Sequence, residues 1–246
     1  MDLSTLSALT WVALIAAAAL TGLAKTAVPG LASVAAALFA TVLPAKESTG
    51  VMLALLLIGD AIALWTYRRD ANTAVLRRLV PSVLAGVGLG ALLLAVSTQA
   101  QMRRAIGTIL LLLVIVTLAQ RRRGPPRVSQ GRVAQAVYGT LAGFTTMAAN
   151  AGGPVTSMYF LASRFSVSEF LGTTAWFFFT VNVIKAPFTI GMGLLRFEHL
   201  PLIGALAPIV LLCAWTGRRL AARISLRVFE PLVIATTIVA TVPLLV

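Results

Sequence analysis

The chain has 246 residues, of which 59% are hydrophobic and only 11% are charged. A soluble domain carries about 25% charged residues, so this composition excludes an ordinary water-soluble protein and predicts an integral membrane protein. The formal net charge of +13 would suggest a nucleic-acid partner if the protein were soluble. Here the basic residues occupy short loops between apolar runs, where they set topology and meet anionic membrane lipid, so we expect no nucleic-acid partner.

Ten apolar runs follow one another along the chain, and a straight membrane span needs about 20 residues, with about 17 as an ordinary minimum. No basic residue precedes the first run, so we expect a retained helix and not a secretory signal peptide. The second and seventh runs are short, and each follows a break rich in glycine and proline. Such segments are half-helices or helices packed inside the bundle, and the sequence leaves open whether they span fully or re-enter. The runs are 6–23, 31–43, 51–65, 79–96, 106–119, 133–149, 154–162, 170–190, 200–215 and 228–246.

Basic residues are distributed unequally between the two sides of the predicted membrane. The positive-inside rule places the side with more arginines in the cytoplasm, so both termini are expected outside the cytoplasmic (inner) membrane. The cytoplasmic group contains Arg68, Arg69, Arg77, Arg78, Arg121, Arg122, Arg123, Arg127, Arg132, Arg164, Arg218, Arg219, Arg223 and Arg227. The outer group contains only Lys46, Arg103, Arg104 and Arg196.

The two halves of the chain resemble each other when they are aligned at an offset of 122 residues. Because each half has five runs, an odd number, the second half enters the membrane from the opposite side. We therefore predict an all-α fold with about ten membrane segments in a single transmembrane domain, 1–246, built from inverted repeats 1–120 and 133–246 with a cytoplasmic linker at 121–132. Inverted repeats with broken helices are typical of secondary transporters that bind substrate near the midplane. The matched positions are Glu47 with Glu169, Gly50 with Gly172, Asp60 with Asn182, and Gly30 with Gly152.

The first break reads Gly22-Leu-Ala-Lys25-Thr26-Ala-Val-Pro29-Gly30. Proline is accepted at a helix start, and a helix N-terminus presents free N–H groups and a partial positive charge. Together with the ammonium of Lys25, this pattern predicts an anion site that includes Thr26 and Gly30. The alternative is that Lys25 extends to the cytoplasmic interface at the end of the first helix.

The second break, 143–154, mirrors the first and contains Thr146, Asn150, Gly152 and Gly153 before a proline. Threonine and asparagine side chains can bind an oxyanion, so these residues are predicted to complete the substrate site. The alternative for Asn150 is that it only caps the helix that follows.

Ionisable residues inside apolar runs are costly, so each is a functional candidate. Asn182 and Lys185 share one face of a predicted helix, and Pro187 should kink it. The alternative for Lys185 is a structural partnership with Asp60 or with backbone carbonyls. Asp60 is a carboxylate well inside a predicted span and is a candidate proton carrier; its alternatives are an ion pair or a place nearer the interface.

Other motifs suggest structural roles. Gly86-x-x-x-Gly90 is typical of a helix-packing face, and Ser166-x-x-Glu169 is typical of a capping box. Aromatic residues near the ends of the runs are typical of membrane-interface anchors: Trp11, Trp65, Tyr67 and Trp215.

Motifs for catalysis and for cofactors are missing. The sequence has one cysteine, one histidine, no Walker loop and no G-x-S-x-G motif. We therefore expect no enzyme activity, no catalytic residues, no metal site and no cofactor.

The quoted breaks, together with Asn182-x-x-Lys185-x-Pro187, resemble the TauE/SafE sulfite exporter family, also called the toluene-sulfonate uptake permease family, over nearly the whole chain. This resemblance implies transport of sulfite, sulfonates or related small organic anions, often coupled to an ion gradient. The first break has fewer glycines than many members of the family.

We expect a secondary transporter for small anions in which Asp60 provides proton coupling. The alternatives are an anion-selective channel and, from another class, a membrane-embedded enzyme acting on lipid. The sequence is compatible with a homodimer, but it sets neither the oligomeric state, the substrate, the direction of transport nor the coupling ion. The predicted substrate-binding residues are Lys25, Thr26, Gly30, Thr146, Asn150, Gly152, Gly153, Asn182 and Lys185.

Overall fold

The computed structural model describes residues 6–27, 29–122, 131–163 and 165–221, and all regular secondary structure in these ranges is helical. The predicted all-α fold is thus confirmed for this part of the chain, whereas the tenth run, 228–246, lies outside it. The helices are α1 (Ala8–Thr26), α2 (Leu31–Val42), α3 (Ala45–Tyr67), α4 (Thr73–Val96), α5 (Gln99–Arg122), α6 (Arg132–Ala149), α7 (Gly153–Ala162), α8 (Val167–Gly191), the 3-10 turn η2 (Phe197–His199) and α9 (Leu200–Ala221).

Helix length separates spanning helices from short ones. Four candidate spans in the described residues are long and apolar enough to cross a membrane: Ala8–Thr26, Ala45–Tyr67, Thr73–Val96 and Phe197–Leu220. By contrast, α2 has 12 residues and α7 has 10. At 1.5 Å per residue these helices are about 18 Å and 15 Å long, roughly half of a 30 Å hydrocarbon core, so neither crosses it alone.

Three helices begin six or seven residues earlier than the apolar runs predicted. The runs at 51–65, 79–96 and 106–119 belong to α3, α4 and α5, which start at Ala45, Thr73 and Gln99. The physical reason is that a helix can begin with a polar turn. Before α4, for example, the Asn72 side chain accepts a hydrogen bond from the Val75 N–H at 3.1 Å.

The predicted capping box at the start of α8 is only half formed. The Ser166 hydroxyl accepts a hydrogen bond from the Glu169 N–H at 3.2 Å, as expected. The Glu169 carboxylate does not fold back; it accepts a hydrogen bond from the Asn72 side chain at 2.9 Å. Glu169 therefore ties the start of α8 to the segment between α3 and α4.

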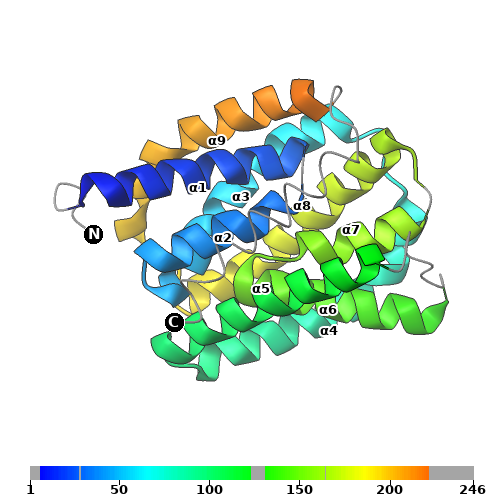
Figure 1. Ribbon diagram of the computed structural model, residues 1–246, viewed down its shortest axis with the longest axis horizontal. Helices are drawn as coiled ribbons and strands as arrows, with labels where there is room; N and C mark the ends of the chain where they lie inside the picture. The colour runs from blue at the N-terminus through cyan, green and yellow to red at the C-terminus, as the bar shows by residue number, and fades with distance from the viewer. Residues whose placement is uncertain (1–5, 28, 123–130, 164, 222–246) are drawn as a thin grey trace.

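Close helix packing places two helix pairs at opposite edges of the bundle, α1 with α9 and α4 with α6, with α3 and α8 between them (Figure 1). The predicted packing face on α4 is confirmed, because Gly86 lies directly against the backbone of Thr140 and Phe144 in α6. Gly22 of α1 lies in the same way against Val210 and Ala214 of α9. A β-carbon at either glycine would collide with the facing backbone, so these glycines permit the short interhelical distance.

Candidate functional site

A buried ion pair joins α1 to α3. Lys25 lies in the last turn of α1, and its Nζ is 2.6 Å from Oδ1 of Asp60; the two side chains are 5% and 0% exposed. The Lys25 stem packs on Gly59, where a β-carbon would lie 2.9 Å from Lys25 Cγ. The ammonium also stands 5.1 Å from the centroid of the Phe178 ring, in cation–π range. Lys25 is therefore buried, and the alternative that it extends to the interface is wrong.

The second oxygen of Asp60 is held by α8. Asn182 Nδ2 donates to Asp60 Oδ2 at 2.7 Å, and both side chains are fully buried. The amide oxygen of Asn182 has no hydrogen-bond partner among the described residues. Asp60 is thus buried between helices and ion-paired, as one of its two alternatives expected.

Lys185 lies one turn further along α8, which continues past Pro187 to Gly191. Its ammonium donates to the Thr146 carbonyl and to Asn150 Oδ1, both at 2.6 Å, and the residue is 2% exposed. Both acceptors are uncharged. Within the described ranges, no carboxylate lies at ion-pair distance from Lys185.

Asn150 connects three helices. It ends α6 in a left-handed conformation, with φ of 52°, and it caps this preceding helix. The following helix, α7, begins at Gly153, and its first backbone hydrogen bond runs from the Thr156 N–H to the Gly152 carbonyl. Asn150 therefore does not cap α7, and that predicted alternative is wrong. The Asn150 side chain donates to the Thr49 carbonyl of α3 at 3.0 Å while it accepts from Lys185.

The two breaks touch each other. Gly153, the first residue of α7, lies against the carbonyl of Pro29, and a β-carbon on it would also come within 3.3 Å of the Gly30 nitrogen. The starts of α2 and α7 therefore meet, as the sequence predicted for the two breaks. The first N–H groups of a helix lack partners inside the helix, so this junction brings two partial positive ends together.

Thr26 and Tyr67 hold the first break in place. The Thr26 hydroxyl donates to the Ala214 carbonyl of α9 at 2.7 Å, and the Tyr67 hydroxyl donates to the Thr26 carbonyl at 3.0 Å. Tyr67, predicted as an interfacial anchor at the end of a run, therefore also has a contact inside the protein. Trp65 and Trp215 do stay exposed, with the Arg218 guanidinium 5.3 Å and 5.8 Å from their rings.

These residues form one group, which we call the charge cluster: Lys25, Asp60, Asn150, Asn182 and Lys185. Lys185 is within electrostatic range of both Lys25 and Asp60. With both lysines charged, the cluster holds two cations and one carboxylate. The sequence analysis missed three residues that contact the cluster: Phe178, Gly59 and Thr49. They contribute an aromatic ring, a glycine and a backbone carbonyl, and none of these stands out in an apolar sequence.

The described residues contain no group of three or more His, Cys, Asp or Glu side chains that could hold a metal ion. The cluster contains two buried ammonium groups, those of Lys25 and Lys185.

Comparison with known proteins identifies the family. The sequence model of the sulfite exporter TauE/SafE family matches residues 14–244, which is nearly the whole chain. Searches among curated proteins and among solved structures gave no match. The family consists of membrane transporters, in agreement with the apolar helices described above. This chain therefore belongs to the sulfite exporter TauE/SafE family.

Proposed function

We propose that the protein is a secondary transporter for small oxyanions such as sulfite or an organic sulfonate, and that the charge cluster binds the transported anion. The observation that carries this proposal is the unequal charge count: Lys25 has a carboxylate partner, whereas Lys185 contacts only uncharged oxygens. A buried ammonium without a counter-charge is costly, by several kcal/mol in order of magnitude. A bound anion would offset that cost.

The neighbouring backbone supports an anion at this place. Lys185 bonds to the end of α6, immediately before the break that opens α7, and that break lies against Pro29 and Gly30. We infer that Lys25 and Lys185 supply charge, and that the anion binds to backbone N–H groups at Gly30, Gly152 and Gly153. Among the other predicted ligands, Thr146 and Asn150 contact Lys185, and Asn182 contacts Asp60, which pairs with Lys25. Thr26 has a different role in the proposal, because its hydroxyl already bonds α9.

Asp60 gives the proposal a route to proton coupling. Asp60 and the substrate anion compete for Lys25, so a proton on Asp60 would release Lys25 and add one positive charge to the cluster. The proton and the anion should then favour each other's binding by the same factor. Asn182 suits both protonation states, because its amide can donate to a carboxylate or turn its unpartnered oxygen to accept from a protonated acid.

Reciprocal contacts support the inverted-repeat architecture. Asp60 and Asn182, 122 residues apart, are the aligned pair and bond to each other, as expected for positions on a pseudo-twofold axis. Glu47, in the first turn of α3, contacts His199 after α8 at 3.4 Å. Glu169, in the first turn of α8, contacts Asn72 after α3 at 2.9 Å. In this architecture both termini face outward and the linker 121–132 faces the cytoplasm, as the arginine distribution predicts.

Flux measurements test the proposal. Purified protein in proteoliposomes should take up sulfite or a sulfonate with saturation, and the rate should respond to an imposed pH gradient. A matched panel of carboxylates should reveal the preferred anion. Lys185→Met should reduce this uptake. Lys46→Met is its matched control, because Lys46 is the one lysine outside the cluster. An anion current without saturation or proton coupling would favour a channel, and no flux of any tested anion would contradict the proposal.

A further inference from the structure

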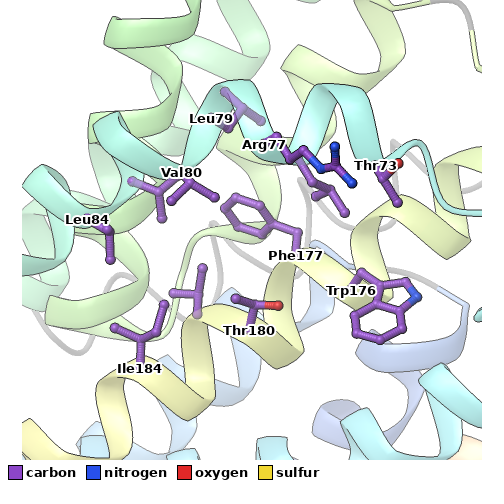
Figure 2. A pocket seen from close by; sticks show the side chains of 12 residues that line it. Thr73, Arg77, Leu79, Val80, Leu84, Trp176, Phe177, Thr180 and Ile184 are labelled. Atoms are coloured by element: carbon purple, nitrogen blue, oxygen red, sulfur yellow. The ribbon is translucent and has the colours of Figure 1, made fainter.

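A groove on the outer surface of the bundle separates α4 from α8 and has a volume of about 280 Å³ (Figure 2). It lies apart from the charge cluster, and most of its lining is apolar. Val80 and Leu84 of α4, both 43% exposed, form one wall, and Ile184 of α8 lies opposite them. Because this face is expected to meet lipid, an apolar groove here would be filled by an acyl chain and not by water.

One end of the groove is polar. Arg77 and Thr73 of α4 and Trp176 of α8 line this end, and the Arg77 guanidinium points toward Thr73, away from Leu84 and Ile184 (Figure 2). The Trp176 indole donates to the Arg68 carbonyl at 3.2 Å, so this end lies beside the arginine-bearing segment between α3 and α4. Tryptophan and arginine together are typical of the headgroup level of a membrane.

Arg77 has no carboxylate partner among the described residues. Its side chain is exposed. The arginine distribution predicts that this segment lies on the cytoplasmic side, where the leaflet carries anionic headgroups. A lipid phosphate would therefore complement the guanidinium, with the option of two parallel hydrogen bonds.

The length of the groove matches one leaflet. Thr73 and Leu84 lie at its two ends on α4, and the helical rise between them is roughly 16 Å at 1.5 Å per residue. A hydrocarbon core is about 30 Å thick, so each leaflet occupies about half of it. We infer that this groove binds an anionic phospholipid of the cytoplasmic leaflet, with its phosphate at Arg77 and an acyl chain along Val80, Leu84 and Ile184.

The bound lipid would contact the same helix that carries Asn182 and Lys185. It would lie between α4 and α8 and stabilise the packing of these two helices. The inference does not depend on which anion is transported, because it rests on the groove, its length, the charge of Arg77 and the predicted cytoplasmic side of this segment.

Native mass spectrometry of the full-length purified protein tests the inference, with phosphatidylglycerol and phosphatidylcholine of identical acyl chains as probes. Phosphatidylglycerol should bind preferentially to the wild type. Arg77→Gln should weaken its binding about fivefold, the contribution of one basic residue near an anionic surface. Arg77→Lys should keep most of the preference. Arg104→Gln, an exposed arginine at the start of α5, is the control and should change nothing.

A second variant tests the acyl-chain half of the site. Thr180 is exposed and lines the groove, so Thr180→Trp should fill the groove and weaken both lipids without touching the core. Variants are compared only when they elute as one symmetrical peak from size-exclusion chromatography. Equal binding of the two lipids, unchanged phosphatidylglycerol binding in Arg77→Gln, or full lipid binding by a well-folded Thr180→Trp protein would each overturn the inference.

Discussion

Replacing Lys185 by methionine tests the unequal charge of the cluster. Methionine keeps an unbranched apolar stem of similar length but removes the ammonium, which now donates two hydrogen bonds of 2.6 Å. If the ammonium also contacts the substrate anion, Lys185→Met should lose one charge-assisted hydrogen bond. That loss is about 1–3 kcal/mol, or roughly fivefold to 150-fold in dissociation constant.

The same substitution should leave the fold intact. The Thr146 carbonyl and the Asn150 side chain lose a donor, at a cost of about 1 kcal/mol each. Removal of a buried charge that no carboxylate neutralises offsets this cost. Expression and monodispersity should therefore match the wild type, so that a loss of binding cannot be assigned to unfolding.

Calorimetric titration of sulfite into the purified variant measures the effect directly. Lys46→Met is the matched control, because it removes the same group at the start of α3, outside the cluster. The control should bind sulfite like the wild type, whereas Lys185→Met should bind more weakly. Wild-type affinity in a well-folded Lys185→Met protein would refute the reasoning and reduce Lys185 to a structural donor for α6.

Asp60→Asn should keep sulfite exchange in proteoliposomes but abolish its response to a pH gradient, and retained coupling would exclude Asp60 as the proton carrier. Gly153→Ala should destabilise the protein by about 1–3 kcal/mol and impair flux, because its methyl group meets the Pro29 carbonyl. Gly88→Ala, which faces open space, should be neutral or stabilising by up to about 1 kcal/mol in thermal unfolding; equal effects of the two substitutions would contradict the close contact of the breaks. A cysteine at Gln130 in a Cys213→Ser background should stay unlabelled by an impermeant reagent on intact cells, and labelling would reverse the predicted topology.

Charge and helix-breaking residues were the most informative parts of the sequence. Ionisable side chains are costly inside a membrane, so Lys25, Asp60 and Lys185 stood out without any structure. The Gly–Pro breaks located the short helices α2 and α7 for a similar reason, since irregular backbone at membrane depth needs protein around it.

The sequence did not predict which residues of the charge cluster bond to each other. The spacing of Asn182 and Lys185 put them on one face of a helix, but it did not say that one would bond Asp60 and the other Asn150. Such pairings depend on how α1, α3, α6 and α8 pack, and small differences in helix rotation decide them. For the same reason Tyr67 resembled an interfacial anchor in sequence, although its hydroxyl bonds the Thr26 carbonyl.

Helix boundaries were missed where polar residues open an apolar helix. The carboxylate of Glu47 lies in the first turn of α3, so the hydropathy signal starts only at Val51. A hydrophobic run reports the part of a helix that meets lipid or core, whereas backbone hydrogen bonding continues into the polar cap.

A structure with bound selenite is the most direct test of the central claim that an anion binds at the charge cluster. Selenite has the charge and shape of sulfite, and anomalous scattering locates its selenium atom without ambiguity. We expect a selenium peak within hydrogen-bond distance of the Lys185 ammonium, beside the meeting point of α2 and α7, and a weaker peak in Lys185→Met crystals. A peak confined to the arginine-rich loops, or one of equal strength at the cluster in the variant, would contradict the account.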